Sequence, residues 1–127
     1  MKAHPMRSPL SQARGLRSAG AGSAHWWTQR VTAVALVPLA IWFLASLLAL
    51  GRGKHIDFVV WLQSPLNTIL MVSFVIALFW HMALGLQVIV EDYVHTRPLK
   101  ILASVAIHTG CALLVVTGLV SIARTIA

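Results

Sequence analysis

Residues 66–90 read LNTILMVSFVIALFWHMALGLQVIV, and this stretch decides the fold. It contains no charged residue, and an α-helix over it would rise roughly 37 Å, because each residue adds about 1.5 Å. A helix needs about 20 apolar residues to cross the hydrocarbon of a bilayer. The stretch therefore predicts a membrane-spanning helix that crosses with some tilt.

Two further apolar runs, residues 31–50 and 101–123, are also long enough to cross a bilayer. Pro38 lies inside the first run, where neighbouring helices can satisfy the freed carbonyl, so we expect a kink and not a break. Residues 56–63 are too few to cross, and we expect them at the membrane interface with Trp61 at headgroup depth. The sequence thus predicts an all-α integral membrane protein with three transmembrane helices.

We expect two parts in the chain: a basic arm over residues 1–24 and a membrane-anchor domain over residues 25–127. Five Lys and Arg residues precede the first predicted helix and two lie in the loop 91–100, against three on the opposite side. The positive-inside rule then places the amino terminus and this loop in the cytoplasm, or in the matrix of an organelle. A bacterial inner membrane is the preferred location over a mitochondrial one, and a cleaved presequence is the alternative interpretation of the arm.

The composition excludes several classes of protein. Of the 127 residues, 58% are hydrophobic and 10% are charged, which is too few charges to cover a soluble domain of this size. The three acidic residues, Asp57, Glu91 and Asp92, lie outside the apolar runs, which argues against a cation-coupled transporter. Most basic residues flank those runs, as topology signals do, which argues against nucleic-acid binding. The single cysteine, Cys111, cannot form an intrachain disulfide.

His81 lies about nine residues, or roughly 14 Å, inside its predicted helix, where an imidazole is costly without a partner. One interpretation is a hydrogen bond to another helix or to a small wet cavity, and the other is axial ligation of a haem iron. Because helix residues turn by about 100°, Gly85, Val88 and Asp92 lie on the same side as His81. Gly85 leaves room either for a flat macrocycle or for a closely packed helix.

Two motifs resemble those of a known family. HMALGLQVIVEDYVH at 81–95 resembles the signature of the small hydrophobic membrane-anchor subunits of succinate dehydrogenase, the D-type, cytochrome b556 anchor family of respiratory complex II. HWWTQRVTA at 25–33 resembles the stretch that leads into the first helix of the same family. The specific combination is a histidine, a glycine four residues later, and Asp-Tyr eleven and twelve residues later. The resemblance covers nearly the whole chain from His25 and implies one half of a heterodimeric helix bundle.

The resemblance also implies roles for individual residues. His81 would be an axial ligand of a haem b whose second ligand comes from the partner anchor (cytochrome b) subunit. Tyr93 and Asp92 would contribute to a ubiquinone site at the cytoplasmic face, where the Tyr93 phenol can donate a hydrogen bond to a quinone carbonyl. Arg30 and His25 would contact the haem propionates. Taken alone, Tyr93 and Arg30 are also typical of an ordinary membrane interface.

The family pattern does not assign the remaining candidates. His108 lies in the third predicted helix at a similar depth, and a haem held by His81 and His108 within one chain is conceivable. We interpret His108 as a packing histidine instead. His95 is either an ordinary loop histidine or a proton donor near neutral pH. Trp26 and Trp27 are most simply interfacial aromatic residues, with packing against an iron–sulfur subunit as the alternative.

The function implied by the resemblance is that of a membrane anchor of succinate:ubiquinone oxidoreductase. Such a subunit docks the flavoprotein and iron–sulfur subunits on the lipid bilayer. The sequence contains neither a flavin fingerprint nor a cysteine set for iron–sulfur clusters, so this chain cannot oxidise succinate by itself. The alternatives are the anchor of a fumarate reductase and, in a different class, a haem-free membrane adaptor or transporter. Because the potentials of haem and quinone depend on the assembled environment, the direction of electron flow stays open.

Overall fold

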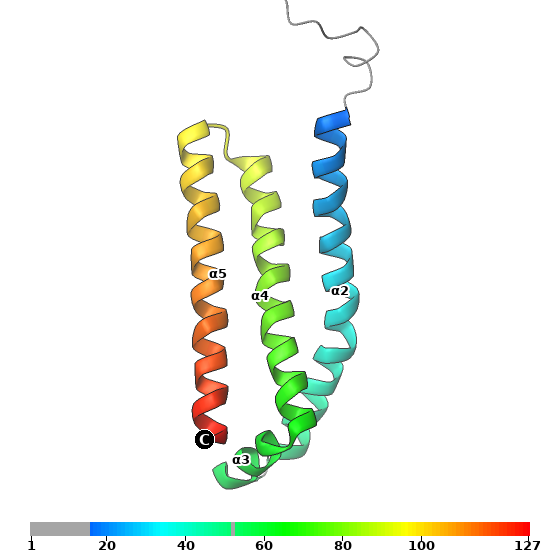
Figure 1. Cartoon of the computed structure of the whole chain (residues 1–127), viewed down its shortest axis with the longest axis vertical. Helices are drawn as coiled ribbons and strands as arrows, with labels where there is room; N and C mark the ends of the chain where they lie inside the picture. Colours follow the sequence, from blue (N-terminus) through cyan, green and yellow to red (C-terminus); the bar gives the residue numbers. More distant parts are fainter. Residues whose placement is uncertain (1–15, 52) are drawn as a thin grey trace, which may run out of the picture.

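The computed structural model describes residues 16–51 and 53–127, with side chains from Ser23 onward. This part of the chain contains four helices, α2 over Leu16–Leu50, α3 over His55–Gln63, α4 over Pro65–Tyr93 and α5 over Arg97–Ile126, and no strand. The three long helices lie side by side with α4 between α2 and α5, and α3 crosses the end of the bundle (Figure 1). The predicted all-α fold is confirmed.

Among the residues that the structure describes, three helical stretches are long and apolar enough to cross a membrane: Ser23–Leu50, Pro65–Tyr93 and Arg97–Ile126. These helical stretches are longer than the apolar runs that predicted them, because a helix continues beyond its apolar part until a turn or a proline boundary ends it. Residues 16–24 of the expected basic arm belong to α2. Residues 1–15 of that arm lie outside the described part of the chain.

A proline lies in the first turn of α4 and of α5. Ser64 is the N-cap of α4 with Pro65 directly after it, and Thr96 precedes α5, which has Pro98 in its first turn. Proline is favourable there because its missing N–H would have no partner inside the helix anyway. Pro38 differs, since it lies inside α2, which continues through it and bends in its second half (Figure 1). The expected kink without a break is therefore observed.

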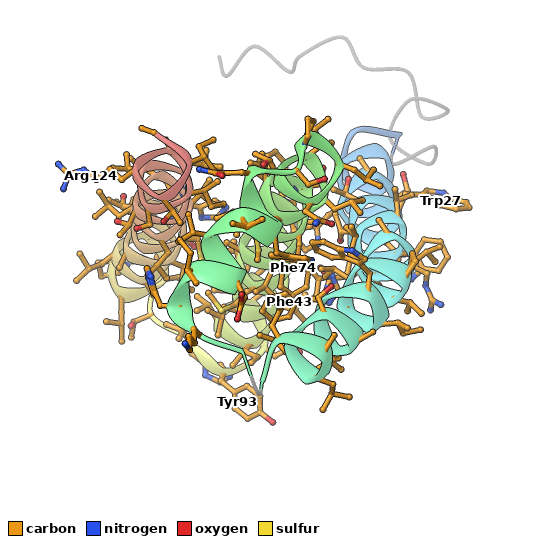
Figure 2. All side chains as sticks on the ribbon, turned by 90° about the horizontal axis from the view of Figure 1, so that it is seen from below. Trp27, Phe43, Phe74, Tyr93 and Arg124 are labelled. Atoms are coloured by element: carbon orange, nitrogen blue, oxygen red, sulfur yellow. The ribbon has the colours of Figure 1, made fainter. Side chains whose placement is uncertain are left out.

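A cluster of buried residues lies at the α3 end of the bundle. Leu62 of α3, Met71 of α4 and Ile122 of α5 are buried together there, and aromatic side chains pack around them. The rings of Phe43 and Phe74 stack with their centroids 4.8 Å apart and join α2 to α4 (Figure 2). This cluster fixes the three long helices at the end away from the 94–96 loop.

The short helix α3 is held in place by hydrogen bonds and by ring stacking. Asp57 accepts a hydrogen bond from the backbone N–H of Lys54 at 2.6 Å, which caps the first turn of α3. Asn67 donates to the carbonyl oxygen of Trp61 at 2.8 Å. Trp61 is half-buried and stacks on Trp42, with ring centroids 5.5 Å apart. Trp61, which we expected only at headgroup depth, thus also joins α3 to α2.

Beyond this core the long helices expose large apolar side chains on most of their surface. Leu48 is 83% exposed and Val34 is 72% exposed, and both lie within a membrane-spanning stretch. Exposed apolar surface of this extent marks contact with lipid or with other helices. The chain is therefore an integral membrane protein whose helices find most of their neighbours outside the chain.

Gly118 marks a tight contact between α5 and α4, because a Cβ atom at this position would lie 3.0 Å from Cγ1 of Val75. Val75 is β-branched and has little χ1 freedom in a helix. We expect Gly118→Ala to be less stable than Gly110→Ala by about 1 kcal/mol. A Cβ atom at Gly110 would meet no atom within 4 Å, so that variant controls for helix propensity. Thermal unfolding in detergent measures the difference, and equal midpoints would contradict the expectation.

Candidate functional site

His81 lies on the side of α4 that faces α2. Its Nδ1 atom is 3.0 Å from Oγ1 of Thr32, and the residue is half-buried. One expectation from the sequence, a hydrogen bond to another helix, is therefore confirmed. The Nε2 atom has no hydrogen-bond partner in the described part of the chain, so the imidazole keeps one nitrogen available for a ligand.

The α2 side of this contact is polar. His25, Gln29 and Thr32 are spaced by four and three residues, so they share one side of α2, and all three are half-buried. Nε2 of His25 and Oε1 of Gln29 are buried atoms without a hydrogen-bond partner. Buried polar atoms in proteins nearly always have partners. These two atoms therefore indicate a polar group that the described residues do not supply.

Gly85 lies one turn from His81 on α4, opposite Gln29. A Cβ atom at Gly85 would lie 3.6 Å from Nε2 of Gln29, which is an ordinary van der Waals distance. The packing of α2 against α4 thus has room for an alanine here. Helix packing, one of the two expected reasons for Gly85, does not by itself require a glycine.

Arg30 and His25 lie on different sides of α2. Arg30 is exposed, and its guanidinium carbon lies 4.5 Å from the ring centroid of Trp26, which is a cation–π contact. At about 100° per residue, Arg30 lies on nearly the opposite side of the helix from Thr32. His25 therefore lies on the side of α2 that carries Thr32, and Arg30 does not.

Tyr93 and Asp92 end α4 at the end of the bundle that is away from α3. Tyr93 is the last residue of the helix and is 77% exposed, and its ring projects outside the bundle (Figure 2). Asp92 is also exposed. The first described turns of α2 lie at the same end (Figure 1), so residues 16–24 and the loop after Tyr93 lie at one end of the bundle. Which side of the membrane this is remains a prediction.

Lys100 holds the end of α4 in place, a role that the sequence analysis did not assign. Its Nζ atom donates a hydrogen bond of 3.0 Å to the backbone carbonyl of Glu91. Side chains of this type commonly satisfy the last carbonyls of a helix. Glu91, to which we assigned no role, accepts a hydrogen bond from Gln87 at 2.9 Å through its side chain. These contacts order the turn that carries Asp92 and Tyr93.

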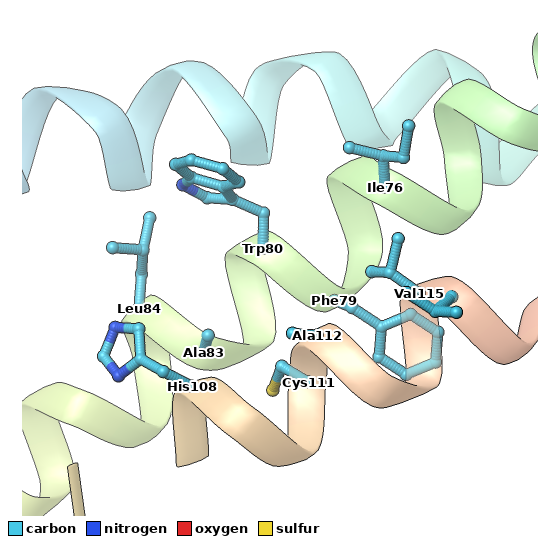
Figure 3. A pocket seen from close by; sticks show the side chains of 10 residues that line it. Ile76, Phe79, Trp80, Ala83, Leu84, His108, Cys111, Ala112 and Val115 are labelled. Atoms are coloured by element: carbon cyan, nitrogen blue, oxygen red, sulfur yellow. The ribbon is translucent and has the colours of Figure 1, made fainter. Parts of the chain in front are cut away.

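His108 lies in a different environment from His81. Its Nδ1 atom is 2.8 Å from the carbonyl oxygen of Ser104 in its own helix. The imidazole lines a largely apolar cavity of about 510 Å³ between α4 and α5, together with Trp80, Leu84 and Cys111 among others (Figure 3). His81 faces α2 instead. The two histidines therefore lie on different sides of α4, and the structure does not bring them together.

Thr32 is a site residue that the sequence analysis missed. It is part of the HWWTQRVTA stretch, seven residues after His25, and is a hydroxyl residue at the start of an otherwise apolar run. The spacing of seven residues could have indicated Thr32 from the sequence, because it places Thr32 and His25 on one side of a helix. Within residues 16–51 and 53–127, no three His, Cys, Asp or Glu side chains converge on a metal site.

Known proteins that the chain resembles include membrane subunits of succinate dehydrogenase. Residues 4–117 match the family described as succinate dehydrogenase/fumarate reductase transmembrane subunit. A succinate dehydrogenase hydrophobic membrane anchor subunit of Rickettsia bellii is 32% identical over 120 residues, which is 94% of this chain and 95% of the relative. The anchor subunit of Rickettsia typhi is 24% identical over 120 residues, with the same two coverages.

A relative from outside Rickettsia has a similar description. The succinate dehydrogenase membrane anchor subunit of Reclinomonas americana is 32% identical over 85 residues, covering 65% of this chain and 71% of the relative. No solved structure matches the chain significantly.

The geometry at Gly85 predicts how the chain tolerates a side chain there. We expect Gly85→Ala to keep α2 packed against α4, because its methyl group would make only ordinary contact with Gln29. The larger Gly85→Leu should separate the helices and destabilise the protein by about 1–3 kcal/mol, the usual cost of overpacking. Thermal unfolding of both variants in detergent tests this. An alanine variant as unstable as the leucine variant would show that the interface is tighter than the structure indicates.

Proposed function

Because the chain belongs to the family of succinate dehydrogenase/fumarate reductase transmembrane subunits and is a succinate dehydrogenase membrane anchor subunit, we propose that it carries half of a haem b site and part of a ubiquinone site. In this proposal it docks the iron–sulfur and flavoprotein subunits on the bilayer, and it pairs with a second, cytochrome b anchor subunit. The observation that carries the proposal is the free Nε2 of His81 beside a hydrogen-bonded Nδ1.

The residues around His81 fit a haem b. A neutral imidazole binds iron through the nitrogen that carries the lone pair, and Nε2 of His81 has no other partner in the described part of the chain. Haem b supplies a one-electron carrier when it is bound. His81 would hold the iron, and the partner anchor subunit would supply the ligand on the other side. Gly85, whose packing role does not require a glycine, would add no side chain of its own beside His81.

We propose that the haem propionates contact the polar end of α2. His25 is the better placed of the two expected residues, because its buried Nε2 has no partner and it shares a side of α2 with Thr32. Arg30 lies beside Trp26 on nearly the opposite side of α2 from Thr32, so we propose it as the more distant contact. A guanidinium forms strong, charge-assisted hydrogen bonds to a carboxylate when it does so.

The quinone would bind at the end of α4. The Tyr93 phenol is exposed there and can donate a hydrogen bond to a quinone carbonyl. That hydrogen bond strengthens as the oxygen gains negative charge, so it favours reduction. Asp92 is adjacent and exposed, and it would orient the site or pass protons through water. Lys100 fixes the helix end that carries both residues.

The surface of the chain supports an assembly in a membrane. Trp26 and Trp27 are 50% and 61% exposed near the end that also carries Tyr93. They are available there to contact the iron–sulfur subunit. We propose that this end faces the cytoplasm and that the membrane is a bacterial inner membrane. The named relatives are succinate dehydrogenase subunits, which favours succinate oxidation over the reverse reaction of a fumarate reductase.

Replacing the proposed ligand should remove the haem. In the purified complex with its partner subunits, we expect His81→Ala to abolish the reduced-minus-oxidised spectrum of a low-spin b-type haem or to convert the haem to high spin. His108→Ala is the matched control, because this histidine also lies within a membrane-spanning helix but lines the cavity between α4 and α5, and the haem spectrum of this variant should be unchanged. A full low-spin signal in His81→Ala would refute the ligand assignment.

Removing only the hydroxyl of Tyr93 should impair the quinone reaction. We expect Tyr93→Phe to lower ubiquinone reduction by roughly tenfold or more, because a donor to the developing oxyanion is lost. Haem content and succinate oxidation with a water-soluble dye should stay at the level of the unmodified complex. Unchanged turnover with ubiquinone would show that Tyr93 is only an interfacial residue.

A further inference from the structure

Thr32 has one hydroxyl proton and three possible partners. Its Oγ1 atom lies 2.9 Å from the carbonyl oxygen of Thr28, 3.0 Å from that of Gln29 and 3.0 Å from Nδ1 of His81. The two carbonyl oxygens can only accept hydrogen bonds. The hydroxyl proton is therefore directed to the backbone of α2, and the lone pairs of Oγ1 remain for His81.

This arrangement selects one tautomer of His81. A hydroxyl that already donates its proton to a carbonyl can only accept from the imidazole, so Nδ1 of His81 carries the proton and donates it to Thr32. In the neutral ring the other nitrogen then holds the lone pair. The opposite tautomer would require the Thr32 hydroxyl to turn its proton away from the two carbonyl oxygens of α2 and toward Nδ1, and it would protonate the nitrogen that a metal needs.

We propose that Thr32 is a positioning residue that holds the imidazole of His81 in the Nδ1-protonated tautomer and presents Nε2 to the haem iron. The inference rests on the proposed function of His81. It assigns to α2 a role in metal binding although α2 supplies no iron ligand. Metal-bound histidines generally donate their second N–H to a neighbouring acceptor, which fixes the ring orientation and makes the ligand more basic.

Loss of this acceptor has a defined consequence. Without the hydroxyl, the Nδ1 proton of His81 has no partner on α2, so the ring is free to rotate and its other nitrogen becomes a weaker base. A weaker base stabilises ferric iron less than before, so the midpoint potential of the haem should rise. Loss of an outer partner of a metal ligand typically lowers metal affinity by about 10–100-fold.

Three variants in the complete complex test this. Thr32→Val has nearly the same shape but no acceptor, Thr32→Ser keeps the hydroxyl, and Thr28→Val is the matched control. Thr28 lies one turn earlier on the same helix, and its hydroxyl also donates to a backbone carbonyl four residues back, at 2.9 Å from Ala24. It therefore controls for loss of a threonine hydroxyl on α2 without loss of a contact to His81.

The readouts are haem content after purification and the haem midpoint potential from a redox titration. We expect Thr32→Val to lose haem more readily and to have a higher midpoint potential. A tenfold loss of affinity confined to the ferric state corresponds to a rise of about 59 mV. Thr32→Ser and Thr28→Val should match the unmodified complex in both quantities. A Thr32→Val complex with unaltered haem content and potential would overturn the positioning role.

Two other outcomes separate the inference from the proposed function. If His81→Ala keeps a full low-spin haem, the ligand assignment fails and the role of Thr32 fails with it. If haem depends on His81 but Thr32→Val behaves like Thr28→Val, only the role of Thr32 fails. Should Thr32→Val not assemble, Thr32→Ala provides the second variant without the hydroxyl. Failure of both to assemble, while Thr28→Val assembles, would assign the hydroxyl to helix packing and overturn the inference.

Discussion

A polar side chain inside an apolar helix must find a partner, and this constraint organises the part of the structure around His81. Lipid offers no hydrogen bonds, so an imidazole at this depth is costly unless protein or a cofactor satisfies it. The chain satisfies one nitrogen with Thr32 and leaves the other open. The unpartnered buried atoms of His25 and Gln29 lie on the same side of α2 as Thr32, so this part of the structure holds polar atoms that the described residues do not satisfy.

The two ends of the bundle are built differently. At the α3 end, aromatic stacking and the buried residues Leu62, Met71 and Ile122 hold the helices together. Beyond this cluster, polar contacts join the packing: Thr32 contacts His81 partway along α4, and Lys100 contacts the last turn of α4. Apolar packing holds helices together but offers a ligand no hydrogen-bonding group, whereas polar side chains can bind one. The rigid end thus supports the end at which the proposed haem and quinone sites lie.

The position of α4 between the other helices separates the two histidines of the membrane interior. His81 faces α2, whereas His108 lines the cavity between α4 and α5. This arrangement of the helices does not place His81 and His108 where both could bind one haem within the chain. The exposed apolar surface of the long helices leaves room for contact with lipid or with further helices.

The sequence by itself determined the three spans and the short helix between the first two, because hydrophobicity and proline boundaries act locally along the chain. It also determined that His81, Asp92 and Tyr93 share one helix at the spacing of the anchor family. Only the tertiary structure decided which neighbour His81 meets, that Gln29 lies opposite Gly85, and that Gly118 lies against Val75. The physical reason is that spans surrounded by lipid are apolar on nearly every side. Their hydrophobic pattern therefore carries little information about which side of each helix meets another.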